Sequence, residues 1–364
     1  MDHVRERRIL EVGDTPYLKL IHPERVDYFY IGKKTAPNKP LLTYGQFRKL
    51  RRLIKSGHYH VLVLSIFGAP GVAWKPERNI FSNILRVIKC RMGHFYLFGI
   101  QIVLWLVEGT QIPLIVIDRK DDPDKIPSHY FPVLRRCRKY YWRELPIKME
   151  NGFLFTTSYL QDTSAVRSSH IFRQHRHKIE PISLGIPWRD SYDRIESDPP
   201  KTIDVFFAGT VKESWVRESG IRLLEELQKE GLNILIAPTP TYSHEEFLKL
   251  CAQSWLVWSP EGHGWDCYRH YESCLAHSIP VINYPRVRRY QPLIDQVHAF
   301  YYAPEGDDLK RVIRRALATN KTELKRISKE GRDHVMKFHL VDKIYSHILS
   351  SDEIKAASRV GTES

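Results

Sequence analysis

The architecture of this chain can be predicted outward from one stretch, Ser259-Pro-Glu-Gly-His-Gly-Trp-Asp-Cys-Tyr-Arg-His-Tyr-Glu272. The apolar residues 255–258 just before it are typical of the end of a buried strand. Gly262 and Gly264 let the backbone approach a ligand with no side chain in between. Asp266 precedes a helical pattern and is predicted to cap it. The stretch therefore predicts a strand, a glycine loop and a helix in succession.

The predicted helix, residues 267–277, has two different faces. Helical spacing places the apolar residues Tyr268, Tyr271, Cys274 and Leu275 on one face, and it places Arg269 and Glu272 on another. A glycine loop that leads into a helix N-terminus favours an anion, because backbone N–H groups and the helix dipole both point at it. Arg269 adds a fixed positive charge, and Glu272 can accept hydrogen bonds from ribose hydroxyls. The alternative is a glycine turn with an Arg–Glu pair on the surface.

These residues resemble the nucleotide-binding half of GT-B glycosyltransferases, in particular the exostosin-like and glycosyltransferase-family-1-like groups. Those groups share a Gly-x-Gly loop, then an Arg, a Glu three residues later, and a strand that begins with a small residue, Ile or Val and Pro. The resemblance extends over roughly residues 112–348 and includes the segments 118–122, 140–145, 204–210 and 301–309. Many GT-B enzymes have a second Glu eight residues before the ribose-binding Glu, and Gly264 stands there in this chain.

The resemblance implies an α/β fold with two Rossmann-like, doubly wound domains that face a cleft. The implied domains are residues 1–180 on the acceptor side and residues 203–340 on the nucleotide-sugar side, joined by a linker at 181–202. Residues 341–364 would be a helix that returns to the first domain and a frayed tail. The implied activity is transfer of a sugar from a nucleotide-diphosphate donor to an acceptor. The donor is then a substrate, and no tightly bound cofactor or metal is expected.

The candidate donor-binding residues come from two loops and the helix. They are Gly209, Lys212, Arg217, Gly262, Gly264, Asp266, Tyr268, Arg269 and Glu272. For Lys212 and Arg217 the alternative is an ordinary helix start with solvated charges.

Candidate catalytic residues are Asp118, Asp121, Asp122, His263 and Arg269. The three aspartates follow a predicted strand, where open α/β sheets place ligands, and one of them is a candidate base. A capped turn with solvated acids is the alternative there. His263 lies between the two glycines, where it can reach the transferred sugar. Arg143 and Glu144 follow an aromatic run and either reach the cleft or lie on a helix surface.

Charge is distributed unevenly along the chain. The protein has 364 residues and a formal net charge of +14. Residues 1–200 contain 33 Lys and Arg against 20 Asp and Glu, whereas the rest contains 23 against 22. A basic first half indicates an anionic partner, such as a phosphorylated glycan, a nucleic acid or a lipid carrier at a membrane surface. A solvated basic surface without a partner is the alternative.

Composition also bears on location. The five cysteines show no CxxC pair and no Cys/His ligand spacing, which indicates a reducing compartment. The apolar run 95–107 is shorter than the roughly 20 residues of a membrane helix, so it predicts a core helix. We therefore expect a cytoplasmic protein without a transmembrane segment, which the basic half can bring to a membrane surface.

Along the chain, predicted strands alternate with predicted helices. In the first half we expect strands at 27–31, 61–66, 112–117 and 153–157, and helices at 44–55, 79–91 and 95–108. In the second half we expect strands at 203–208, 232–237, 255–258 and 280–283. The helices expected there are 214–230, 244–252, 267–277, 307–318, 322–337 and 340–350. This alternation indicates parallel sheets with helices on both faces.

Two other functional classes remain open from the sequence. One is a nucleic-acid-binding protein whose second domain is a degenerate transferase, since helix 44–55 is strongly basic. Nucleic-acid binding and sugar transfer would both apply to a glycosyltransferase that acts on modified DNA bases. The other is a scaffold that binds a nucleotide sugar without turnover.

Overall fold

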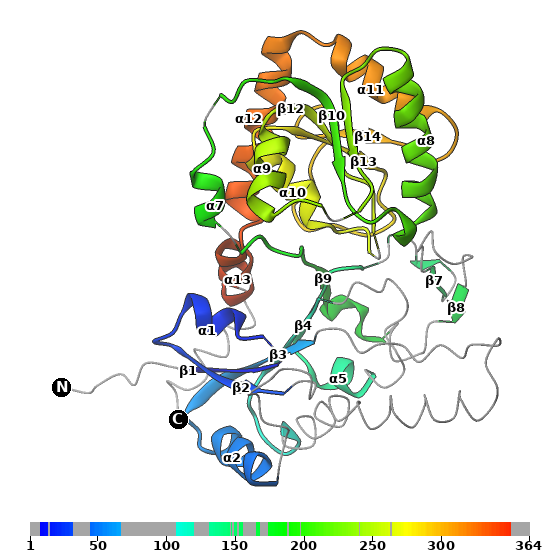
Figure 1. The fold of residues 1–364 in the computed structure, drawn as a ribbon. Coiled ribbons are helices and arrows are strands. Elements are labelled where there is room, and N and C mark those ends of the chain that lie inside the picture. The colour runs from blue at the N-terminus through cyan, green and yellow to red at the C-terminus, as the bar shows by residue number, and fades with distance from the viewer. Residues whose placement is uncertain are drawn as a thin grey trace, which may run out of the picture.

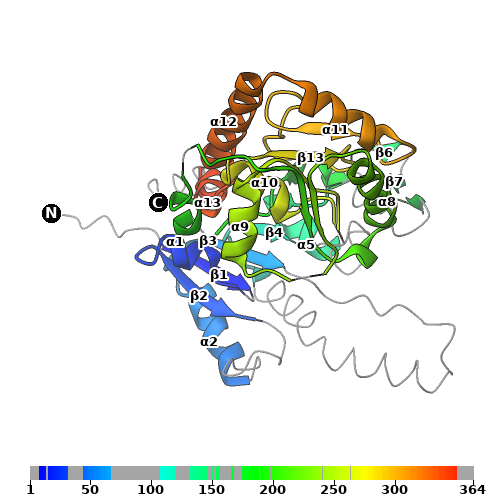
Figure 2. The ribbon, with the colours of Figure 1, turned by 45° about the horizontal axis from the view of Figure 1, so that its top comes forward.

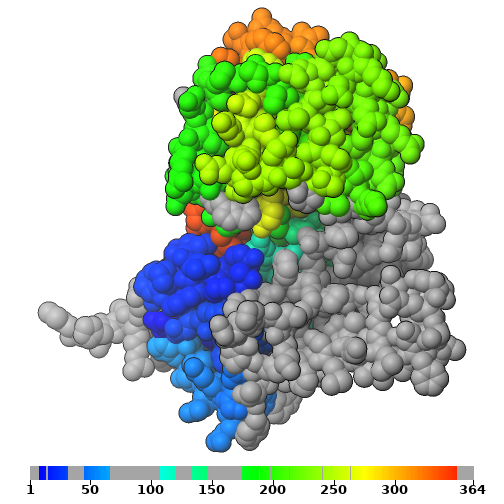
Figure 3. Space-filling view, in the orientation of Figure 1, coloured from blue at the N-terminus to red at the C-terminus, as the bar shows by residue number. Residues whose placement is uncertain are grey.

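The protein is built around two parallel β-sheets, one in each half (Figure 1). The computed structural model describes residues 8–13, 15–31, 44–66, 107–119, 131–145, 147, 149–150, 153–155, 165–167, 174–187, 189–196, 198–239, 241–262 and 264–350. The predicted helix 79–91, all but the last two residues of the predicted helix 95–108, and the 351–364 tail lie outside these residues. In Figure 3 the green-to-orange half stands above the blue segments, with red between them.

The first sheet has six parallel strands in the order β2-β1-β3-β4-β5-β9. In that order they are Val26–Tyr30, Arg8–Gly13, Tyr59–Ile66, Leu114–Asp118, Lys139–Trp142 and Ile179–Pro181. Its described helices are α1 (Tyr17–Ile21), α2 (Tyr44–Lys55) and α5 (Phe131–Arg136). A small antiparallel sheet joins β6 (Met149–Glu150), β7 (Phe153–Phe155) and β8 (Ala165–Arg167).

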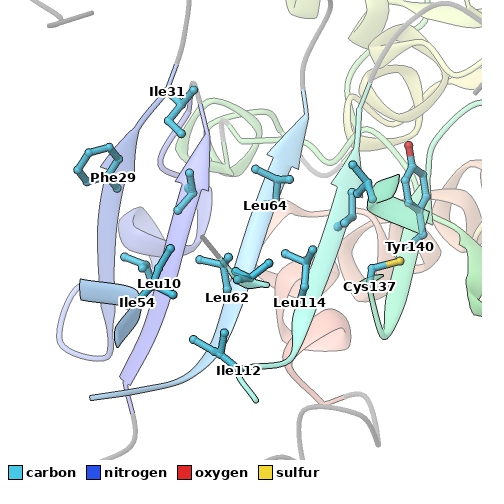
Figure 4. Packing of buried hydrophobic residues seen from close by; sticks show 14 of the residues in the cluster. Leu10, Phe29, Ile31, Ile54, Leu62, Leu64, Ile112, Leu114, Cys137 and Tyr140 are labelled. Atoms are coloured by element: carbon cyan, nitrogen blue, oxygen red, sulfur yellow. The ribbon is translucent and has the colours of Figure 1, made fainter. Parts of the chain in front are cut away.

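Alternation along the strands gives the first sheet a core on each face. Leu10 packs with Leu50 of α2 and Val133 of α5, and Figure 4 shows this layer running across neighbouring strands. Its neighbour Ile9 faces the other way and packs with Leu18 of α1 and with α13 (Val341–Leu349). The last described helix, α13, thus covers the first sheet, beside α1 in both Figure 1 and Figure 2.

The second sheet has five parallel strands in the order β11-β10-β12-β13-β14. They are Ile234–Ala237, Ile203–Ala208, Ser254–Trp258, Ile279–Asn283 and Phe300–Tyr302. One face packs against α8 (Trp215–Lys229) and α11 (Asp308–Ala318). The other packs against α9 (His244–Ala252) and α10 (Tyr268–Leu275). Helix α12 (Lys321–Phe338) contributes to both layers, with Leu324 and Ile327 on the side of α8 and α11 and Val335 on the side of α10. Both sheets are therefore covered on both faces, which confirms the predicted doubly wound α/β architecture.

The chain crosses between the two halves twice, and the two crossings are hydrogen-bonded to each other. Ile186 pairs with Leu340 in an isolated parallel bridge. The Ile186 N–H donates to the His339 carbonyl at 2.9 Å, and the Val341 N–H donates to the Ile186 carbonyl at 3.1 Å. The segment predicted as a linker thus contains a bridge and the short helix α7 (Arg189–Asp193).

Candidate functional site

A cavity of about 620 Å³ lies at the carboxyl ends of the second sheet's strands, where open α/β sheets bind ligands. The loop after β10 and the loop after β12 form two of its walls. Helices α9 and α10 form others, and Arg143 from the first half closes one side. The residues that line it are Arg143, Leu184, Ala208, Gly209, Arg217, Thr241, Tyr242, His244, Phe247, Gly262, Gly264, Asp266, Cys267, Tyr268, Arg269 and Glu272.

The glycine loop is held by His270, a buried residue of the helix that follows it. Its Nε2 lies 2.7 Å from the Trp265 carbonyl, and its Nδ1 lies 2.7 Å from Ser259 Oγ. Because a carbonyl can only accept, Nε2 carries the proton and Nδ1 accepts from the serine hydroxyl. Burial lowers the pKa of His270 to about 3, so the ring stays neutral. This one side chain ties both ends of the loop to α10.

The loop is also held from the first half of the chain. The backbone N–H groups of Trp265 and Asp266 donate to the Glu144 carboxylate at 3.0 and 3.1 Å. The Asp266 side chain in turn accepts from the Leu184 N–H at 2.7 Å and from the Tyr271 hydroxyl. The prediction that Asp266 caps α10 is therefore wrong: the N-cap is Cys267, without a side-chain cap bond. Asp266 instead joins the loop to the first crossing.

Arg269 brings an unsatisfied positive charge to the cavity. Its guanidinium lies 5.1 Å from the centroid of the Phe207 ring, and its Nη1 is buried without a hydrogen-bond partner among the described residues. Burial, and then the nearby Arg217, lower the pKa of Arg269. Gly209 leaves room for this side chain, because a Cβ at Gly209 would collide with Arg269 Nη2. A cation without a partner here fits an anionic ligand.

Glu272 lies one turn further along α10 and also lines the cavity. Its Oε1 lies 2.9 Å from His244 Nε2, at the start of α9, and accepts from the Tyr192 hydroxyl at 3.3 Å. The hydrogen bond to Glu272 raises the pKa of His244. The carboxylate is therefore fixed from two sides, and its free acceptor capacity can serve a ligand hydroxyl.

The two cations predicted after β10 differ in position. Arg217 lines the cavity and is buried, but its guanidinium donates to the carbonyls of Glu261 and Thr210, both at 2.8 Å. It links the two loops that flank the site. Lys212 is exposed and is not among the residues that line the cavity. The geometry thus gives Arg217, and not Lys212, a place beside the predicted nucleotide.

Of the predicted catalytic acids, Asp118 is buried at the end of β4 and accepts from the Tyr140 hydroxyl at 2.6 Å. It is neither a solvated turn residue nor a residue that lines the cavity. Asp121, Asp122 and His263 lie outside the described residues. Arg143 and Glu144 are buried and follow strand β5, so the alternative of a helix surface is wrong for them.

Sequence reasoning missed His244 and Tyr192 as parts of the site. His244 opens α9, directly after the N-cap Ser243 and inside the Ser243–Glu246 capping box. A His at a predicted helix start after a strand end could have marked it as a candidate. Tyr192 had no such signal, because α7 lies in the segment predicted as a linker.

Within the described part of the chain, no three His, Cys, Asp or Glu residues are grouped so that they could hold a metal ion. No described helix is long and apolar enough to cross a membrane. The four described cysteines, at positions 137, 251, 267 and 274, are free thiols.

Comparison with known proteins gives matches in structure only. No protein-family model matches the chain, and no curated protein matches it in sequence. A sucrose-phosphate synthase from Thermosynechococcus elongatus matches with a TM-score of 0.50 at 11% identity, covering 98% of this chain and 100% of that one. An α,α-trehalose 6-phosphate synthase from Burkholderia multivorans matches with 0.50 at 9% identity, covering 98% and 99%. An α-glucosyltransferase in complex with UDP and a mismatched DNA 13-mer matches with 0.50 at 9%, covering 97% and 100%.

These likenesses extend over nearly the whole chain, so they concern both sheets and their relative arrangement. At this level of identity they show the fold and nothing finer. The fold is the GT-B fold, with two Rossmann-like domains and the cavity where they meet.

Proposed function

We propose that this protein is a glycosyltransferase that uses a nucleotide-diphosphate sugar as donor. The observation that carries the proposal is Arg269, a cation whose Nη1 is buried without a partner among the described residues, beside a glycine loop at a helix N-terminus. Backbone N–H groups, the helix dipole and the guanidinium all favour a diphosphate there. The structural neighbours named above, sugar-transferring enzymes of which one holds UDP, support the same reaction class.

In this proposal the diphosphate lies against Arg269 and the ribose against Glu272. As the bond between sugar and diphosphate breaks, negative charge grows on the leaving phosphate. Arg269 and the start of α10 are already oriented toward that charge, which lowers the barrier without reorganisation. No resident cofactor is needed in this scheme, since the donor carries the group that is transferred. The first half, through Arg143, bounds the cavity on the side from which an acceptor would enter.

For the acceptor we propose an anionic molecule, on the basis of the excess of Lys and Arg in residues 1–200. The exposed residues of α2 include Arg48, Lys49, Arg52 and Lys55, and α2 contains no acidic residue. A phosphorylated glycan and a membrane-surface lipid carrier both fit this charge. We do not favour a nucleic-acid-binding protein with a degenerate transferase domain, because the residues of the donor cavity retain the charges that a nucleotide sugar requires.

The test is a thermal-shift screen with UDP-, GDP-, ADP- and CDP-sugars, followed by calorimetry with the donor that stabilises the protein most. We expect Glu272→Ala to weaken that donor by about 1.5–3 kcal/mol, the range for a hydrogen bond to a charged group. Glu226→Ala is the matched control, since Glu226 is paired with Lys310 on the surface of α8. Equal donor affinity in the two variants would rule out the proposed ribose site.

A further inference from the structure

Glu144 is an acidic residue of the first half of the molecule whose side chain accepts hydrogen bonds from the backbone of the second half. It is fully buried and follows strand β5. Its Oε2 accepts from the Trp265 N–H at 3.0 Å, and its Oε1 accepts from the Asp266 N–H at 3.1 Å. Arg143 Nε lies 3.4 Å from the same Oε1. One carboxylate therefore accepts hydrogen bonds from two consecutive backbone amides and also lies next to a guanidinium.

The two amides belong to the part of the loop that forms the cavity wall. Gly264 directly precedes them, Cys267 directly follows, and Arg269 comes two positions after Cys267; all three line the cavity. A loop held through two adjacent N–H groups has its peptide planes fixed, so the direction of the neighbouring groups is fixed as well. The N-terminus of α10 and the Arg269 side chain then have a defined position relative to the first half.

We propose that Glu144 is a positioning residue: it holds the glycine loop in its donor-binding shape only while the two halves are in this arrangement. The inference rests on the proposed function of the cavity. Donor affinity would then depend on a residue more than 100 positions from the loop in sequence that does not itself line the cavity. Separation of the halves would release the loop and the donor together.

The chain contains a chemically matched control, Glu11 of β1. Glu11 is also fully buried, and its two carboxylate oxygens accept from two consecutive amides, Leu18 and Lys19, both at 3.0 Å. Burial raises the pKa of each of the two side chains to about 7. The amides that Glu11 holds belong to α1 of the first half, and none of these residues lines the cavity.

The experiment compares Glu144→Gln with Glu11→Gln. Each substitution keeps the shape of the side chain and replaces one acceptor oxygen by an amide group that cannot accept. Thermal unfolding measures the structural cost, and calorimetry with UDP, GDP, ADP and CDP measures binding. We expect both variants to unfold at a lower temperature, and we expect only Glu144→Gln to weaken the preferred nucleotide, by about tenfold or more. Glu144→Asp, which keeps the charge but is shorter, should bind with intermediate affinity.

A second readout is the pH dependence of nucleotide binding between pH 6 and 8.5. Arg143 on its own segment, and Glu261, Asp266 and Cys267 on the facing loop, interact electrostatically with Glu144 and are present in every variant. The ionised carboxylate is the form that accepts two amides. We therefore expect the unmodified protein to lose affinity on acidification through about pH 7, more steeply than Glu144→Gln does.

The outcomes separate the two proposals. If the unmodified protein binds none of the four nucleotides, the proposed function fails, and the role of Glu144 fails with it. If it binds one of them and Glu144→Gln binds it equally well, only the role of Glu144 is overturned. Equal weakening by Glu144→Gln and Glu11→Gln would likewise overturn it, because the effect would then follow from lost stability alone. If Glu144→Gln does not fold, the same comparison is made with Glu144→Asp.

Discussion

A buried polar atom without a hydrogen-bond partner is costly inside a protein, and among the described residues Arg269 Nη1 is such an atom. Its neighbours offset this cost only in part: Glu272 interacts electrostatically with the guanidinium, but no described residue accepts a hydrogen bond from Nη1. Phe207 offers only a ring face at 5.1 Å, and Arg217 adds a like charge. An anion bound in the cavity would supply the acceptor that Arg269 Nη1 lacks among the described residues.

From this we predict opposite effects of Arg269→Ala on stability and on function. Without ligand, the melting temperature should stay unchanged or rise, because removal of an uncompensated charge is not destabilising. The stabilisation by a nucleotide-diphosphate sugar should be lost. In steady-state kinetics kcat should fall more than the donor KM rises, since the charge matters most as the diphosphate leaves. A pure KM effect would reduce Arg269 to a binding residue.

A second prediction at the residue scale concerns Gly209→Ala. The new Cβ collides with Arg269 Nη2, so the guanidinium must move, and donor affinity should fall about tenfold or more. In an Arg269→Ala background the same change should have little further effect on affinity. Gly231→Ala is the control, because it also has a positive φ but no atom within 4 Å of the added Cβ. Additive losses in the double variant would show that Gly209 acts independently of Arg269.

At the scale of helices and strands, periodicity predicted most elements of the second half. The predicted bounds of β10, α9 and α2 agree with the structure. Strands β1, β5, β6, β8, β9 and β14 were not predicted. Of these, β1 and β9 contain charged residues or proline at their ends, which hides a strand pattern, and β6, β8 and β14 have only two or three residues. The candidate site was predicted from two separate local patterns, the helix with Arg269 and Glu272 and the loop after β10 with Gly209 and Arg217, and all four residues line the cavity. Tyr192 reaches Glu272 from 80 positions away, and no local pattern predicts such a contact. For Glu144 the sequence left the cleft and a helix surface as alternatives, without its contact to the loop at Trp265.

The packing of α8 on β12 gives a prediction at this scale. Gly220 of α8 lies directly against the Trp258 ring, and an added Cβ would overlap it. Gly220→Ala should therefore destabilise the protein by about 1–3 kcal/mol, the range for overpacking a filled core, despite the higher helix propensity of alanine. Urea unfolding measures the change. Ser219→Ala, one position earlier on the same helix, should change it by much less, and a stabilised Gly220→Ala would contradict the packing described here.

At the scale of the whole molecule, the two crossings contain a histidine that must remain neutral. His339 is buried, with Nδ1 3.0 Å from Ser183 Oγ and Nε2 2.8 Å from the Gln291 carbonyl. Burial lowers its pKa to about 3, against roughly 6.5 for an unfolded chain. Its contribution to stability is thus complete above about pH 6.5. It decreases as the pH falls toward 3, because only the unfolded chain then takes up the proton.

We predict that His339→Gln flattens the pH dependence of stability. Between about pH 6.5 and 4 the unmodified protein should lose about 1.4 kcal/mol per pH unit more than the variant does. His270 and His277, whose pKa values are also lowered, are present in both proteins. The difference in the slope of unfolding free energy against pH therefore measures the contribution of His339. Urea unfolding at pH 7, 6 and 5 gives the slopes. If the free energies of unfolding of the two proteins had the same pH dependence, His339 would not stay buried and neutral in the folded state. The crossing at residues 339–341 would then open to water before the domains unfold.

The charge difference between the halves gives the last prediction. With an anionic acceptor, the acceptor KM should rise steeply with salt while donor affinity changes much less. Arg48→Glu combined with Arg52→Glu should raise the acceptor KM and leave donor binding unchanged, since both residues are exposed on α2. Acceptor kinetics that are insensitive to both salt and this double variant would favour a neutral acceptor.

The pairing of Ile186 with Leu340 places the beginning and the end of the segment 187–339 next to each other. In topological terms, residues 187–339 are a guest segment inserted into a host domain, which consists of the first sheet and its helices. Helix α13, which packs on the host, follows the guest segment in the chain. Neighbouring ends are what a transplantable unit requires. We therefore expect residues 187–339 to tolerate exchange with the corresponding segment of another protein of this fold, and the host to accept such a guest without a change in its own sheet order.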